Sequence, residues 1–182
     1  MWGELILEKN KSYFIFLILF LVVVFSGYLS LEDEYENSIL SFKIPENWTV
    51  VDVTNLDTIA GLKPVGTSNT LIDVTITDVS PPELVDGYIK NFSEKDPDFL
   101  IMEKEAVTVD GSEGIKLVYR MGRKDVEDLN SSYYVSSLIA FSKNNNTYVI
   151  SSVEVSNRDY QTLVEPAMNK VTRTIKIKEY FN

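Results

Sequence analysis

The sequence predicts an α+β fold: an antiparallel sheet of about six or seven strands packed with two main helices, preceded by one N-terminal transmembrane helix. An uncharged apolar run occupies residues 13–31. After it, apolar and polar residues repeatedly alternate, with the period of half-buried strands. Residues 81–95 and 160–171 instead carry apolar side chains at helical spacing. Each amphipathic helix needs a sheet surface to cover, so we expect an α/β/α sandwich, or both helices on one face.

The apolar run is long enough to cross a bilayer, since a hydrocarbon core of about 30 Å requires about 20 apolar residues in a helix. Lys9 and Lys11 precede the run, and lysines on the short leading side favour a cytoplasmic N-terminus. We therefore expect a single-pass protein of the cell membrane with its C-terminal domain outside. The predicted parts are a cytoplasmic N-terminus (1–12), a transmembrane anchor (13–31), an acidic, solvated spacer (32–38) and an extracytoplasmic domain (39–182).

A cleaved signal peptide is the alternative for the same run. Its charged start, apolar core and small residues at Ser26-Gly27 suit such a peptide. No Ala-x-Ala-type site ends the run, however, and no Cys follows it, which excludes lipid attachment of the bacterial lipoprotein kind. We therefore favour an uncleaved signal-anchor.

The charge and composition of the chain exclude several kinds of partner and several kinds of catalytic and metal site. Glu4 and Glu8 balance Lys9 and Lys11, so the whole net charge of −10 lies on residues 32–182. Such an acidic domain repels phosphates, and we expect no nucleic-acid partner. The chain contains neither His nor Cys. This excludes Ser-His-Asp and Cys-His catalysis and the common zinc sites.

The alternating segments place the strands and the breaks between them. We expect strands at 40–44, 48–54, 71–79, 99–109, 113–121, 133–141, 148–155 and 175–177, and loops at 55–69 and 122–132. The strand at 99–109 has a polar middle, and Asp110-Gly111 after it is a hairpin signal. Ser80 and Glu83 form a capping-box pattern at the start of the first helix, which should run to Lys95. In the last helix, Pro166 predicts a kink or a boundary.

Calcium is the only metal that the composition favours, because only oxygen ligands are plentiful. The candidate ligands are acidic residues in two loops: Asp96, Asp98, Asp125, Glu127 and Asp128. None of them has the spacing of an EF-hand, and solvated loop carboxylates are the alternative. We expect no catalytic and no cofactor-binding residue, with calcium left open.

Tyr133 and Tyr134 are the candidate contact aromatics. Adjacent residues of a strand point to opposite faces, so we expect one of the two rings to be exposed. An exposed Tyr could contact a protein partner. Packing within the sheet is the alternative.

The order of elements and several local strings resemble the PsbP-like family, whose fold is shared by the Mog-type Ran-binding protein. The strings are Phe42-Lys43-Ile44-Pro45-Glu46-Asn47-Trp48, Val109-Asp110-Gly111-x-x-Gly114, Tyr148-Val149-Ile150 and Ile175-Lys176-Ile177. The resemblance covers about residues 40–177, and with the leading apolar run it is that of a membrane-anchored, archaeal-type member. It implies a sheet sandwiched by helices and an extrinsic role at a membrane.

In photosynthetic members that role is assisting the oxygen-evolving centre and its retention of calcium and chloride. This chain lacks a plastid targeting segment, a lipobox Cys and any His. We therefore expect a non-catalytic binding or assembly role near the membrane surface, with an envelope protein as partner. Two alternatives stay open: a cell-surface hydrolase that uses carboxylates in a deep cleft, and a weak calcium-binding module.

Overall fold

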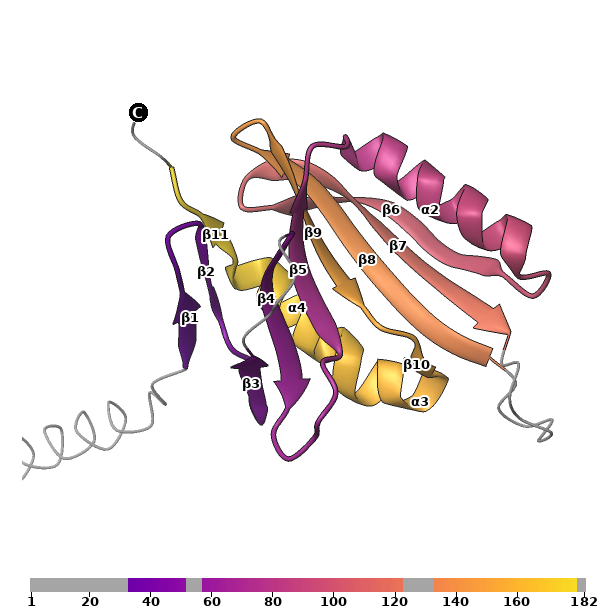
Figure 1. Ribbon diagram of the computed structural model, residues 1–182, viewed down its shortest axis with the longest axis horizontal. Helices are drawn as coiled ribbons and strands as arrows, with labels where there is room; N and C mark the ends of the chain where they lie inside the picture. Colours follow the sequence, from indigo (N-terminus) through magenta and orange to yellow (C-terminus); the bar gives the residue numbers. More distant parts are fainter. Residues whose placement is uncertain (1–32, 52–56, 123–132, 180–182) are drawn as a thin grey trace, which may run out of the picture. The chain divides into compact units, whose positions relative to one another are not determined.

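The computed structural model describes residues 33–51, 57–122 and 133–179 (Figure 1). These residues belong to one compact unit that begins at Asp33. The predicted cytoplasmic segment 1–12 and anchor 13–31 lie outside the described residues. Within the described ranges, no helix combines the length and the apolar character needed to cross a membrane.

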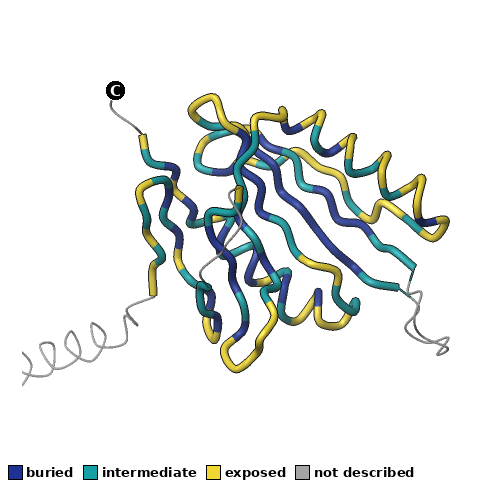
Figure 2. Tube along the Cα trace, viewed as in Figure 1, coloured by how far each residue is buried: buried dark blue, intermediate teal, exposed yellow. Residues whose placement is uncertain are grey.

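An eight-stranded antiparallel sheet forms the centre of the domain. Its strands, in spatial order, are β3 (Trp48–Val51), β4 (Thr58–Pro64), β5 (Ile72–Thr77), β9 (Asn146–Ser152), β8 (Tyr133–Lys143), β7 (Ser112–Gly122) and β6 (Leu100–Val109), and the short β10 (Val155–Ser156) also pairs with β8. The middle strands are the most buried (Figure 2). Alternation in the sequence therefore located six of these strands, but neither β4 nor β10 as separate strands.

The two faces of this sheet carry two separate apolar cores. Leu117, Leu138 and Val149 belong to one core, while their chain neighbours Val118, Ile139 and Ile150 belong to the other. Helix α2 (Pro81–Lys95) covers the first core with Val85 buried at its centre, and helix α4 (Glu165–Thr174) covers the second through Ala167, Met168 and Val171. The helices thus lie on opposite faces, which confirms the α/β/α arrangement (Figure 1).

Helix α2 has the predicted bounds, but its N-terminus differs from the prediction. Ser80 stands at the N-cap, yet its side chain makes no capping hydrogen bond. The first helical bond runs from the Leu84 N–H to the Ser80 carbonyl. Pro81 and Pro82 occupy the first turn, where their missing N–H groups leave no helical bond unmade, so the helix does not depend on a capping box.

The last helix contains the boundary predicted at Pro166. It consists of α3 (Asn157–Asp159), the π-helical segment η1 (Tyr160–Val164) and α4 in succession. The Ser156 hydroxyl caps its start by accepting the Asp159 N–H at 3.1 Å. In a regular α-helix the Pro166 ring would crowd the Thr162 carbonyl. The wider π turn lies just before it, and Pro166 falls in the first turn of α4.

A second, three-stranded sheet was not predicted. It contains β1 (Glu34–Glu36), β2 (Leu40–Lys43) and β11 (Lys176–Ile177) in the order β1-β2-β11. The spacer expected at 32–38 therefore includes a strand rather than only a solvated linker. Its one aromatic residue explains why: the Tyr35 ring lies 5.1 Å from that of Phe42, and its hydroxyl donates to the Ile59 carbonyl at 3.1 Å.

The loop expected at 55–69 was also partly wrong, because β4 occupies Thr58–Pro64. Gly61 lies at the middle of this strand. A Cβ added there would stand 3.0 Å from Val51 Cγ2 and 3.1 Å from Thr70 Cγ2. The glycine that made this stretch resemble a loop is required for close packing between neighbouring segments.

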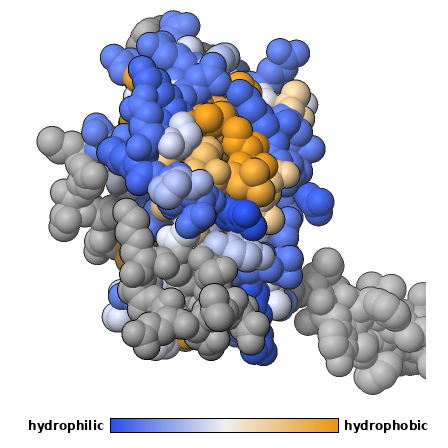
Figure 3. Space-filling view, turned by 90° about the vertical axis from the view of Figure 1, so that its right-hand side faces the viewer, coloured by the Kyte–Doolittle hydropathy of each residue, from blue (hydrophilic) through white to orange (hydrophobic). Residues whose placement is uncertain are grey.

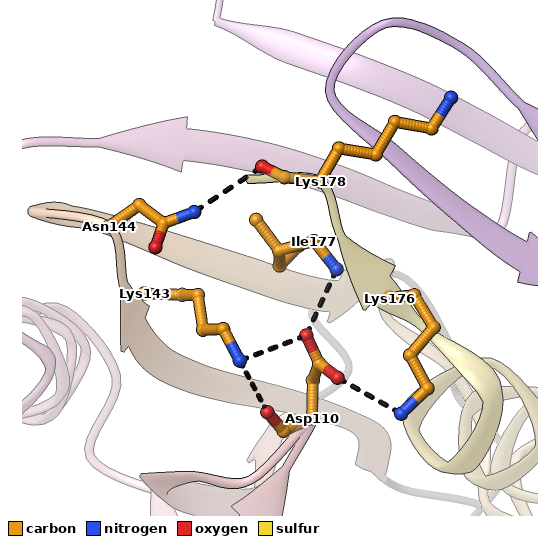
Figure 4. Close-up of polar contacts among 6 residues, drawn as sticks. All are labelled: Asp110, Lys143, Asn144, Lys176, Ile177 and Lys178. Carbon is orange, nitrogen blue, oxygen red and sulfur yellow. Dashed lines mark hydrogen bonds and ion pairs between the residues drawn. The ribbon is translucent and has the colours of Figure 1, made fainter. Parts of the chain in front are cut away.

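Asp110 joins the β6–β7 hairpin to the second sheet (Figure 4). It occupies a left-handed turn with Gly111, at φ 49° and 76° respectively, as the Asp-Gly hairpin signal predicted. Its carboxylate Oδ1 lies 3.0 Å from Lys176 Nζ, and its carbonyl accepts a hydrogen bond from Lys143 Nζ at 2.7 Å. Two strings of the family resemblance therefore meet at this contact.

Candidate binding site at one end of the sheet

Several residues singled out in the sequence meet where α2 ends and β8 begins. A hollow of about 420 Å³, here called the end pocket, is lined by Phe92, Lys95, Asp96, Met121, Gly122, Tyr134 and Glu154. Asp96 and Tyr134 were predicted as site residues from the sequence. The loop 123–132, with the candidates Asp125, Glu127 and Asp128, lies outside the described residues.

Asp96 has a structural role in this pocket. It is 8% exposed, and its Oδ1 accepts the Asp98 N–H at 2.9 Å while its Oδ2 accepts the Gly122 N–H at 2.7 Å. The carboxylate thereby fixes the turn after α2 to the last residue of β7. A Cβ added at Gly122 would stand 2.8 Å from Asp98 Oδ2, so both predicted carboxylates lie close to this glycine.

The described residues contain no group of three or more His, Cys, Asp or Glu side chains that could hold a metal ion. Asp96 and Asp98 form a pair, and both oxygens of Asp96 accept backbone hydrogen bonds. Calcium prefers six to eight oxygen ligands. A calcium site here would therefore need ligands beyond the described residues.

Tyr133 and Tyr134 point to opposite faces, but both are half-buried rather than one being exposed. Tyr133 packs against the core under α4, and the guanidinium carbon of Arg120 lies 5.2 Å from its ring centre. Tyr134 stands opposite Met121 in the β7–β8 ladder and lines the end pocket. Tyr134, and not Tyr133, is among the residues that line the end pocket.

A layer of aromatic rings lies behind the end pocket. The Tyr119 ring is 5.3 Å from that of Phe92 and 5.6 Å from that of Phe99. Burial raises the pKa of Tyr119 to about 12, although a hydrogen bond with Ser136 opposes the shift. Tyr119 therefore stays neutral at physiological pH, and this layer contributes packing and no acid–base chemistry.

Three consecutive exposed apolar residues lie at the start of β6. Leu100, Ile101 and Met102 are consecutive and are 49%, 38% and 49% exposed; we call them the β6 ridge. Figure 3 shows apolar side chains gathered on one face of the molecule and bordered by hydrophilic ones. Among the described strands, β6 pairs only with β7 and so forms an edge of the sheet.

Sequence reasoning missed the β6 ridge. Residues 99–109 were interpreted as an ordinary strand with a polar middle, although Phe99, Leu100, Ile101 and Met102 form four apolar residues in succession. Such a run breaks the alternation of a half-buried strand and could have indicated an exposed apolar residue. The register shifts between Ile101 and Glu103, and this irregularity lies at Met102.

Acidic residues follow the ridge along β6. Glu103 lies 2.8 Å and Glu105 3.6 Å from Lys116 Nζ. The hydrogen bond from Lys116 lowers the pKa of Glu103. Desolvation alone would lower the pKa of Lys116. The hydrogen bond to Glu103 and the negative charge of Glu103 outweigh desolvation, so the pKa of Lys116 is raised. Two carboxylates share one ammonium, so the surface beside the ridge is acidic.

A second hollow, here called the α2 groove, runs beside the first half of α2. It measures about 530 Å³ and is lined by Asp57, Thr58, Thr75, Ile76, Thr77, Asp78, Leu84, Tyr88, Asn146 and Val149. None of these residues was singled out from the sequence, because their strands are distant in the chain.

The chain is similar to proteins of one family in sequence and to several solved structures in fold. A family model described as PsbP-like protein matches residues 22–171. The fold is similar to the solution structure of cyanobacterial PsbP (CyanoP) from Synechocystis, with 14% identity and a TM-score of 0.54, over 80% of this chain and 92% of that one. No curated protein matches the chain in sequence.

Two further crystal structures share the fold. LpqN, involved in cell envelope biogenesis of Mycobacterium tuberculosis, is 11% identical with a TM-score of 0.53, over 83% of this chain and 87% of its own. A protein of Bacteroides thetaiotaomicron is 9% identical with a TM-score of 0.52, over 83% of this chain and 50% of its own. At these identities the likeness shows the fold alone, and it confirms the architecture that the strings implied.

Proposed function

Because the chain belongs to the PsbP-like family, we propose that it is a non-catalytic binding or assembly domain that docks an envelope protein through the β6 ridge. In this proposal residues 13–31 anchor it in the cell membrane and hold the domain outside. The single observation that carries the docking is the exposure of three consecutive apolar side chains on an edge strand. Apolar side chains gathered at a surface and bordered by polar ones are typical of a protein interface.

The geometry of β6 favours docking through side chains over addition of a long strand. The register shift at Met102 interrupts the ladder, and Glu103, Lys104 and Glu105 follow at once. Bulges and charged residues are devices that prevent edge-to-edge pairing. The side chains of the ridge are therefore available for contact with a partner, while the rest of the β6 edge is protected from pairing with another strand.

The net charge argues against a second copy of the chain as the partner. Each copy carries a net charge of −10, so two copies repel each other as they approach. A partner with a basic surface meets no such repulsion.

A different protein with a complementary surface satisfies both features of the ridge. Its contact surface would present apolar side chains to Leu100, Ile101 and Met102, and Lys or Arg side chains to Glu103 and Glu105. Basic residues at the rim would steer the encounter, because the whole domain is acidic. We therefore assign the partner an apolar contact patch with a basic border.

The position of β1 limits the length of the tether. Asp33, the first described residue, follows the predicted anchor after one residue, and β1 begins at Glu34. A chain extends at most about 3.6 Å per residue. The proposal thus holds β1 close to the membrane surface, and the partner is an envelope protein within reach of a domain tethered there.

Site-specific cross-linking in native membranes tests the proposal. A photoreactive amino acid replaces Met102 in the full chain, with Val65 as the matched control, because Val65 is 66% exposed but lies outside the ridge. We expect a product with a second protein from Met102, none from Val65, and loss of the product in an Ile101→Glu background. A free monomer only, a product of two copies of this chain, or equal products from both positions would contradict the proposal.

A further inference from the structure

The α2 groove is built from polar residues of β4, β5 and β9 and from one side of α2. In β5, Ile72 and Val74 point into the core under α4, so Thr75 and Thr77 point to the other face. There Thr75 pairs with Val149 and Thr77 with Thr147 of β9. Helix α2 packs mainly on β7 and β8, which leaves the β5 side of this face open.

Two kinds of surface meet in this groove. Tyr88 and Leu84 of α2 and Val149 of β9 supply an aromatic ring and aliphatic carbon, and the strands supply the hydroxyls of Thr58, Thr75 and Thr77. Two carboxylates, Asp57 and Asp78, and the amide of Asn146 complete the lining. Ligand sites combine apolar walls with a few convergent polar groups in this way.

The charge of the lining restricts the ligand. The residues that line the groove include no Lys or Arg, so a phosphate or carboxylate would meet two carboxylates without a compensating cation. An apolar ligand would bury the threonine hydroxyls and the carboxylates without partners, which costs free energy. A ligand rich in hydroxyl groups fits both conditions, because hydroxyls donate to carboxylates and both donate to and accept from threonines.

We propose that the α2 groove binds a saccharide without acidic groups, such as a unit of a neutral or amine-bearing surface polymer. The sugar hydroxyls pair with the threonines, Asn146 and the two carboxylates, and the less polar face of the sugar ring packs on Tyr88. The volume of about 530 Å³ is in the range of small-molecule sites. This proposal is independent of the β6 ridge, since no residue belongs to both surfaces.

Calorimetric titration of the full chain in lipid nanodiscs tests it. The probes are chitobiose and cellobiose as neutral disaccharides, the disaccharide of glucosamine as an amine-bearing one, and digalacturonate as an acidic one. We expect binding of at least one of the first three with a Kd of about 1 mM or below, and none of digalacturonate. Absence of binding by all three at about 10 mM, or equal binding of digalacturonate, would overturn the proposal.

Matched variants locate the binding. Thr75→Val keeps the shape of the side chain and removes the hydroxyl, and Asp78→Asn removes one charge at the rim; each should weaken binding about tenfold, as the loss of one hydrogen bond to a buried partner does. Thr75→Ser should restore it. Asp86→Asn is the control, because Asp86 lies on α2 outside the groove and pairs with Lys104. Equal weakening by Asp86→Asn, or none by either groove variant, would contradict the site.

Discussion

The carboxylate of Asp110 accepts the backbone N–H of Ile177 at 3.0 Å, although the two residues lie 67 positions apart. The same carboxylate lies 3.3 Å from Lys143 Nζ and 3.0 Å from Lys176 Nζ. A turn residue of the first sheet thus satisfies a backbone donor of the second. The Asp of the Val-Asp-Gly string therefore has a structural role.

Asp110→Asn should destabilise the domain by about 1–2 kcal/mol, because it removes the charge from three short contacts on a side chain that is only 10% exposed. Asn also tolerates the left-handed turn, so the loss reports the contacts and not the backbone. Urea unfolding of the full chain measures it. Asp86→Asn, which removes an exposed ion pair, should change the free energy of unfolding by less than about 0.5 kcal/mol; equal losses would contradict this account.

The contribution of Asp110 should also depend on pH. Burial alone would raise the pKa of this carboxyl, but the Ile177 N–H and the two lysines outweigh burial and lower the pKa below its usual 3.8. The folded state then binds fewer protons than the unfolded state, so the contribution is present above the unfolded pKa and is lost as pH falls through the folded pKa. The stability difference between wild type and Asp110→Asn should shrink between about pH 5 and pH 3. A constant difference over that window would be evidence against the ion pairs.

Gly114→Ala should destabilise by about 1–3 kcal/mol, as overpacking of a tight contact does. The new Cβ would stand 2.7 Å from the Ala140 carbonyl oxygen and 2.8 Å from Phe141 Cβ. The backbone of β8 at these two residues cannot shift without distorting the sheet. Gly87→Ala is the control. Nothing lies within 4 Å of its added Cβ, so it should stabilise α2 by about 0.5–1 kcal/mol. Thermal unfolding should separate the two variants in opposite directions.

Asp96→Ala should cost about 1–3 kcal/mol, because it leaves the N–H groups of Asp98 and Gly122 without their acceptor in a part-buried turn. Asp98→Ala should cost less than about 0.5 kcal/mol, since the Asp98 side chain is exposed. Denaturant midpoints of the two variants decide it. A larger effect at Asp98 would mean that its carboxylate has a function of its own.

Titrating calcium into the full chain should release no heat up to about 1 mM, because the Asp96 oxygens already accept two amide hydrogen bonds and a calcium site needs six to eight oxygen ligands. Calorimetry with magnesium as the matched ion measures this. Heat with calcium alone, abolished by Asp125→Asn or Asp128→Asn, would instead support a calcium-binding module that uses the loop 123–132.

Much of the fold could be predicted because local patterns and final packing agree. Helix α2 has the predicted bounds, since Pro81 starts it and Pro97 prevents its continuation. The Asp-Gly hairpin and the alternating strands β7 to β9 were also correct. In each case one short segment contained both the residues that form the turn or helix end and the regular spacing of apolar residues.

The elements that were missed depend on distant residues. β4 exists because β3 and β5 pair on either side of it, and nothing in its Gly and Pro content indicates a strand. β1 is acidic, and it is held by pairing with β2, by the packing of Tyr35 on Phe42 and by the ion pair of Glu36 with Lys178. The α2 groove was missed for the same reason, because its lining residues range from Asp57 to Val149 and sequence periodicity does not relate positions so far apart. The β6 ridge is local in sequence, and the run of apolar residues 99–102 could have indicated it.

The second sheet cannot be completed until nearly the whole chain has been synthesised. Its middle strand β2 leaves the ribosome early, yet one neighbour, β11, appears almost last among the described residues, and the Lys178–Glu36 ion pair joins positions 142 apart. Closing so long a loop is slow, because the chain loses conformational entropy before the contacts of the sheet compensate for it. Leu40 and Phe42 of β2 therefore remain partly exposed until β11 leaves the ribosome. A holding factor that shields nascent apolar surface would act on this region, and a stalled chain lacking β11 would be the species most prone to aggregate.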